Sequence, residues 1–96
     1  MIPASARLHG MGVVARTRPG LTLAPTGNTR HYADGRLIEG IARLEIEGED
    51  EGFYLFHFDE EGRNVIDTWH ETLDEAVEQS GFEYGVSPED WIKLEN

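Results

Sequence analysis

The chain has 96 residues, of which 8 are basic and 19 are acidic, so its formal net charge is −11. A chain of this length buries one modest hydrophobic core and is too short for two independent domains. It has no cysteine, which excludes disulfides and thiolate chemistry, and no signal-peptide pattern or apolar run approaching about 18 residues, so we expect a soluble cytoplasmic protein with no membrane contact.

The charges are distributed unevenly along the chain. Residues 1–33 contain four arginines and no acid (+4), whereas residues 34–96 contain 4 basic and 19 acidic residues (4 − 19 = −15). Proline and glycine interrupt the apolar runs of the first part, which leaves only 11–15 and 21–24 as short candidate strands. We therefore expect one domain, in which a basic and partly irregular segment 1–33 is packed on or extends an acidic β-β-β-α unit over 34–96.

Three strands are predicted after residue 37. Apolar and charged residues alternate over 41–47, which is typical of a half-buried strand. The aromatic run 53–59 is expected to form the central strand, because aromatic side chains are enriched in strands. A turn at 59–62 then leads to a third strand over 64–69.

The register between the last two strands has two solutions. A bulge at Gly62 places Phe56 opposite Ile66, whereas a plain four-residue loop places His57 there. A slip of one residue exchanges the two faces of a strand, so the two solutions bury different side chains. The sequence does not choose between them.

The helix is the best-marked element. Thr72 followed by Glu75 is a capping box, in which the threonine oxygen and the glutamate carboxylate each accept a backbone hydrogen bond. Gly85 is suited to the left-handed conformation that ends many helices. Helical spacing predicts one inward-facing stripe, formed by Leu73, Ala76, Val77, Ser80 and Tyr84.

These elements predict an α+β fold. We expect a three- or four-stranded antiparallel sheet packed against one C-terminal helix, after a partly irregular N-terminal segment. Trp69 ends the third predicted strand and Trp91 follows the helix, and we expect both indoles near the seam between sheet and helix.

The segments Phe53–Asp59, Asp67–Ala76 and Phe82–Val86, together with Trp91, resemble a group of small bacterial proteins of unassigned function. The resemblance covers about residues 52–92 and implies a strand-strand-helix module. Some members are grouped with immunity-type or inhibitor-type proteins. The resemblance thus implies a binding role and indicates no catalytic residue.

Two histidines and an aspartate form the most reactive constellation in the chain. His57 and Asp59 share one face of a strand, and His70 lies at the exit of the next, where imidazole beside carboxylate could bind zinc or relay a proton. No His-x-x-x-His or Glu-x-x-His spacing accompanies them. We therefore expect no enzyme, metal or other cofactor, and keep a metal-binding protein or metal-dependent enzyme using these three residues as an alternative.

The acidic surface carries the functional hypothesis. No lysine or arginine occurs over 64–92, and 45–51 contains five acids in seven residues. A field of one sign accelerates association with a cationic protein and disfavours nucleic acid. We therefore expect a non-enzymatic domain of the immunity, antitoxin or inhibitor type that binds a basic nuclease or nucleic-acid-binding protein. The predicted partner-binding residues are Glu71, Asp74, Glu75, Glu78, Glu47, Glu49, Asp50 and Glu51.

A homo-oligomeric structural protein is the remaining hypothesis. The run from Phe53 to Phe58 is apolar on both faces of its strand. A sheet face that the single helix leaves uncovered could therefore form an interface between copies.

Overall fold

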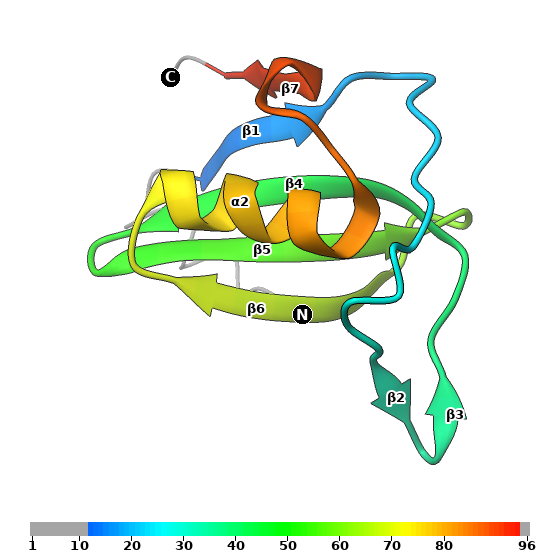
Figure 1. The fold of residues 1–96 in the computed structure, drawn as a ribbon. Helices are drawn as coiled ribbons and strands as arrows, with labels where there is room; N and C mark the ends of the chain where they lie inside the picture. Colours follow the sequence, from blue (N-terminus) through cyan, green and yellow to red (C-terminus); the bar gives the residue numbers. More distant parts are fainter. Residues whose placement is uncertain (1–11, 95–96) are drawn as a thin grey trace.

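The computed structural model describes residues 12–94, and Figure 1 shows their arrangement. Five strands form one antiparallel sheet in the order β6-β5-β4-β1-β7. Their bounds are β1 (Gly12–Thr17), β4 (Ile41–Glu49), β5 (Gly52–Asp59), β6 (Asn64–His70) and β7 (Trp91–Lys93). Helix α2 and the short 3-10 helix η1 separate β6 from β7, and their bounds are Leu73–Tyr84 and Pro88–Asp90.

The α+β class is confirmed, but the sheet has five strands and not three or four. The basic N-terminal segment supplies β1, which lies between β4 and β7 and pairs with both. The tail supplies β7, which pairs with β1 alone. The candidate strand at 11–15 overlaps β1, but its place between β4 and β7 was not predicted, and neither was β7, because both depend on pairing between distant parts of the chain. The second candidate strand, 21–24, forms no strand.

A small second sheet stands apart from the main one. Strands β2 (Tyr32–Ala33) and β3 (Arg36–Leu37) form a hairpin that projects away from the body of the molecule in Figure 1. All four residues are exposed. The hairpin therefore adds little to the core.

The register between β5 and β6 combines the two predicted solutions. Next to the turn, Phe58 lies opposite Asn64, as the bulge at Gly62 predicts. The register then shifts by one residue, and His57 lies opposite Ile66. The shift places His57 on the face of the sheet that α2 covers, where it is fully buried.

Helix α2 lies across one face of the sheet, over β4 and β5 (Figure 1). Its capping box is confirmed, because Thr72 Oγ1 accepts from the Glu75 N–H and the Glu75 carboxylate accepts from the Thr72 N–H, both at 3.1 Å. Gly85 ends the helix at φ 68°. The inward stripe is also confirmed. The core beneath it consists of Ala15, Ile41, Leu44, Ile46, Leu55, Ala76, Tyr84, Val86 and Trp91.

The two tryptophans lie on different faces of the sheet. Trp91 is buried at the seam as predicted, and its indole N–H donates to Ser80 Oγ at 3.1 Å. The prediction for Trp69 is wrong. Trp69 lies opposite Tyr54, on the face away from α2, because side chains alternate along β6. Its ring lies against Gly52 and remains 47% exposed.

Over residues 12–94, no helix is long and apolar enough to cross a membrane.

Candidate functional site

A groove of about 630 Å³ lies between the end of β6 and the outer side of α2. We call it the acidic groove, because three of its lining residues are glutamates. It is lined by Trp69, His70, Glu71, Glu75, Glu78, Gln79 and Phe82. The last four come from successive turns of α2, where residues three or four apart share one face.

The groove carries a charge of one sign. Glu71 and Glu78 are exposed, and among the residues that the structure describes no lining residue is a lysine or arginine. Burial lowers the pKa of His70 below its ordinary value, so this imidazole is neutral at pH 7. Its Nε2 lies 2.9 Å from Thr68 Oγ1. Within the described part of the chain, neither the histidine nor any other lining side chain therefore neutralises the three carboxylates.

One carboxylate of the groove is held in place by the start of the helix. Glu75 Oε2 accepts hydrogen bonds from the backbone N–H groups of Glu71 and Thr72, both at 3.1 Å. These bonds fix the side chain over the first turn. Glu75 thus presents its charge without a large loss of side-chain entropy when a ligand binds.

Exposed aromatic rings accompany the carboxylates. Phe82 is 51% exposed on the last turn of α2, although large apolar side chains are usually covered. Trp69 borders the groove at the β6 edge, and its ring lies on the other face of the sheet, away from the carboxylates of α2. Aromatic side chains beside carboxylates suit a cationic partner, because the ring face attracts a cation and the carboxylate pairs with it.

The predicted acidic turn lies at the same end of the molecule as the groove. Glu49 pairs with Gly52, so Asp50 and Glu51 form a tight turn between β4 and β5. This turn and the connection from β6 to α2 lie together at the left in Figure 1. A Cβ at Gly52 would lie 2.6 Å from the Trp69 ring, which places the turn beside the groove.

Two predicted partner-binding residues lie elsewhere. Glu47 is buried, and alternation along β4 directs it to the face away from α2. Asp74 is exposed on another side of α2, where it borders a small hollow next to Trp91 and Lys93. Neither residue lines the acidic groove.

The three residues of the metal hypothesis lie apart. His57 is buried beneath α2, whereas Asp59 belongs to the turn after β5 and accepts hydrogen bonds from the N–H groups of Glu61 and Arg63, both at 2.9 Å. His70 lies at the opposite end of β6 from that turn. Over residues 12–94, no group of three His, Asp or Glu side chains is placed to hold a metal ion.

The aromatic face proposed for an interface between copies is largely covered. Phe56 is buried, and Tyr54 stacks on it with ring centroids 5.9 Å apart. The Arg43 guanidinium lies 4.1 Å from the centre of the Phe58 ring. Trp69 and Val65 on the same face remain exposed, and the hypothesis of an interface between copies stays a prediction.

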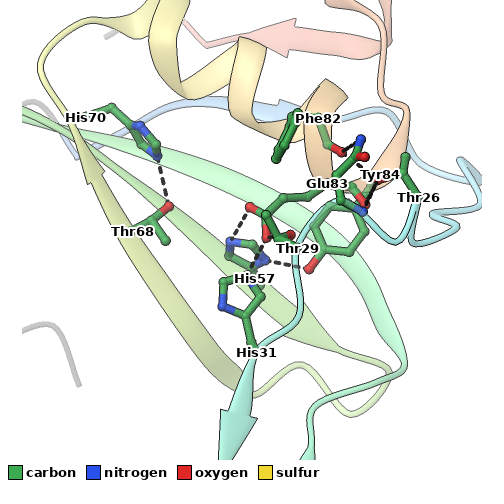
Figure 2. A network of polar contacts seen from close by, with 10 residues as sticks. Thr26, Thr29, His31, His57, Thr68, His70, Phe82, Glu83 and Tyr84 are labelled. Atoms are coloured by element: carbon green, nitrogen blue, oxygen red, sulfur yellow. Dashed lines mark hydrogen bonds and ion pairs between the residues drawn. The ribbon is translucent and has the colours of Figure 1, made fainter.

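A second polar site, which the sequence analysis missed, lies beneath the end of α2 (Figure 2). The Glu83 side chain is 1% exposed, and its Oε1 accepts from Thr29 Oγ1 at 2.8 Å and contacts His31 Nε2. His57 Nδ1 lies 2.8 Å from the Tyr84 hydroxyl. The Glu83 contacts and the His57–Tyr84 pair lie side by side: His57 Nε2 and Glu83 Oε2 are 3.9 Å apart. Within the described residues, neither of these two atoms has a hydrogen-bond partner.

The pKa shifts show how this cluster is charged. Burial lowers the pKa of His57 to about 4, and the nearby Glu83 carboxylate only partly opposes this, so the imidazole is neutral at pH 7. Burial raises the pKa of Glu83, but the hydrogen bonds from His31 and Thr29 outweigh it and the net shift is downward. Glu83 is therefore a buried carboxylate that remains ionised.

The segment 25–31 holds this cluster closed, and we call it the strap. Thr26 Oγ1 donates to the Phe82 carbonyl at 2.5 Å, and Asn28 Nδ2 donates to the same oxygen at 2.9 Å. The Thr26 N–H donates to the Glu83 carbonyl at 2.9 Å. These bonds satisfy carbonyls that the end of a helix leaves without partners. A cavity of about 410 Å³ lies beside the strap, next to His31 and Tyr84.

One signal in the sequence could have found Glu83. It lies seven residues after Ala76 and three after Ser80, so helical spacing puts it on the inward stripe. Its partners on the strap lie 52 and 54 positions earlier in the chain, and no local pattern connects them.

No protein-family model matches the chain, and no curated protein or solved structure matches it either. The resemblance to small bacterial proteins of the immunity or inhibitor type therefore stays a prediction from the sequence.

Proposed function

We propose that this protein is a non-enzymatic binding domain whose acidic groove engages a basic protein, as an immunity, antitoxin or inhibitor protein does. One observation carries the proposal. Three glutamates and an exposed phenylalanine line a single groove, and none of its lining residues within 12–94 is a lysine or arginine. A cationic segment would find both charge and aromatic surface there.

The electrostatics of the whole chain support the same partner. A net charge of −11 attracts a basic protein from a distance and raises the association rate at low salt. Within the groove, Glu71 and Glu78 meet the cation after contact, and Phe82 contributes a ring face. Charge alone would serve solubility, but solubility does not require a half-exposed aromatic ring among the carboxylates.

The test separates the groove from the overall charge. The double variant Glu71→Gln, Glu78→Gln removes two groove charges, and its matched control Glu60→Gln, Glu89→Gln removes two exposed charges elsewhere. A basic partner is first captured from the native host at low salt and purified. Its association with each variant is then measured at several salt concentrations.

We expect the groove variant to bind at least about fivefold more weakly than the control, with a smaller dependence on salt, because the lost pairs are local. Equal losses in both variants would contradict the proposal, since they would show that only the net charge matters. Unchanged binding in both would remove electrostatics from the interaction altogether.

A further inference from the structure

The acidic groove is bounded on one side by the edge of the main sheet. Strand β6 is the last strand in the order, and within residues 12–94 it pairs only with β5. Alternate residues of such a strand direct their N–H and C=O groups away from the sheet. Proteins usually protect an edge with charged side chains, proline, a bulge or a very short strand. Strand β6 has seven residues and no lysine or proline, its register shift lies at 64–66 away from the groove, and its charged residue is Asp67, which is itself complementary to a basic segment.

The side chains of β6 divide the surroundings of this edge into two zones. Thr68 and His70 lie on the face that α2 covers, and His70 lines the groove together with Glu75 and Glu78. Trp69 lies on the opposite face and is 47% exposed. A strand added beside β6 would direct alternate side chains to these two zones, because the side chains of every strand alternate.

We propose that the basic partner of the groove binds by strand addition. An extended segment of the partner pairs with β6 as a sixth strand of the sheet. Its lysine or arginine side chains, at every second position, lie over Glu75 and Glu78, and the apolar side chains between them contact the ring of Trp69. Backbone hydrogen bonds supply affinity, and the alternation supplies specificity. This inference rests on the proposed function and specifies how its partner is recognised.

A helical partner segment is the competing mode. An amphipathic helix would present its basic residues at a spacing of three and four, and it would leave the N–H and C=O groups of β6 unpaired. The groove lies at the junction of an edge strand and a helix, and it includes two residues of β6. An added strand would pair with the backbone of β6 and place its basic side chains beside the glutamates of α2. The structure therefore favours strand addition over a bound helix.

The test uses peptides, because a proline within β6 could unfold the protein. The probe is a peptide in which arginine and valine alternate. It has about ten residues, which is the length of a long strand. Two further peptides carry backbone N-methyl groups on one or the other set of alternate residues. N-methylation removes the hydrogen-bond donor and keeps the charge. A fourth peptide has the same composition at helical spacing.

Binding is measured by titration with two-dimensional NMR of the intact protein. We expect the alternating peptide to protect amides of β6 from exchange and to give cross-strand contacts with them. One of the two N-methylated peptides loses at least about tenfold in affinity, because its blocked set faces β6. The helically spaced peptide binds more weakly than the alternating one.

A second measurement tests the apolar zone. Serine in place of the valines weakens binding to the wild type, and this loss is much smaller in the Trp69→Ala variant, because the valines have lost their contact. Equal losses in both proteins would overturn the assignment of the valines to Trp69.

The outcomes separate this inference from the proposed function. If both N-methylated peptides bind as tightly as the probe, or if the helical peptide binds best, strand addition is wrong. The proposed function still stands in that case, provided that Glu71→Gln, Glu78→Gln weakens binding of the partner. If the alternating peptide does not bind, the inference is overturned whatever the partner does.

Discussion

Helix α2 carries two carboxylates with opposite surroundings. Glu78 is exposed and lines the acidic groove. Among the described residues, no lysine or arginine lines this groove. Glu83 lies five residues further along the same helix, and it is buried against Thr29, His31 and His57. The comparison shows that a net charge of −11 combines two kinds of group. Burial decides whether a carboxylate holds the fold together or is available to a partner.

The largest expected effect sharpens this comparison. We expect Glu83→Ala to lower the free energy of unfolding by about 3–5 kcal/mol, because it removes the acceptor that Thr29 and His31 share and leaves a cavity beneath α2. The matched variant Glu78→Ala should change stability by no more than about 0.5 kcal/mol. Urea unfolding at pH 7 measures both. Similar effects at the two positions would show that the buried site has no special role in stability.

The pH dependence of stability tests the imidazole of the same cluster. The pKa of His57 is about 4 in the folded protein and 6.5 in the unfolded chain, so the unfolded chain takes up the proton first as the pH falls. The stabilising contribution of neutral His57 is therefore complete above pH 6.5 and is lost progressively as the pH falls toward 4. The loss is about 3 kcal/mol at most, from 1.36 kcal/mol per pKa unit.

The pKa of Glu83 is lowered, so its contribution is lost at still lower pH and in the same direction. The control for the imidazole is His57→Gln. Between pH 6.5 and 4 we expect the variant to lose stability less steeply than the wild type, as measured by urea unfolding at several pH values. Parallel curves would assign the pH dependence to other groups.

The smallest of the three effects on stability is expected at Gly52, where the acidic turn contacts the Trp69 ring. A Cβ at Gly52 would lie 2.6 Å from the Trp69 ring and 2.7 Å from the His70 carbonyl oxygen. We expect Gly52→Ala to cost about 1–3 kcal/mol, as overpacking usually does, and to shift the tryptophan fluorescence. In a Trp69→Ala background the same change should cost less, because only the backbone clash remains. An equal cost in both backgrounds would exclude the ring contact.

The sequence predicted the local features of the fold and missed those that connect distant segments. The capping box at Thr72 and the glycine at position 85 act within a few residues, so their pattern was sufficient. The pairing of β1 with β4 and β7 joins segments about 30 to 80 residues apart, where loop-closure entropy and competing partners decide the outcome. The sequence therefore indicated β1 only as a candidate strand at 11–15, and its place in the sheet and the strand β7 could not be predicted.

The candidate site shows the same division. Glu71, Glu75 and Glu78 were predicted as partner-binding residues from helical spacing and charge, and they line the groove. Their role in binding stays a prediction. The contribution of the β6 edge and the position of Trp69 depend on the register, which the sequence left open. The buried cluster required knowledge of the strap and was therefore beyond any local pattern.

The strap has a consequence for folding. The last carbonyls of α2 are capped by Thr26 and Asn28, which lie more than fifty positions earlier in the chain. The end of the helix cannot fray without first releasing the strap, so these two segments should open as one cooperative unit and exchange their amide hydrogens together. These two segments therefore unfold together although they lie on either side of the border between the basic and acidic parts of the chain. A fragment that begins at residue 34 would keep Thr72 and Gly85 but lack the hydrogen bonds of the strap to the end of its own helix.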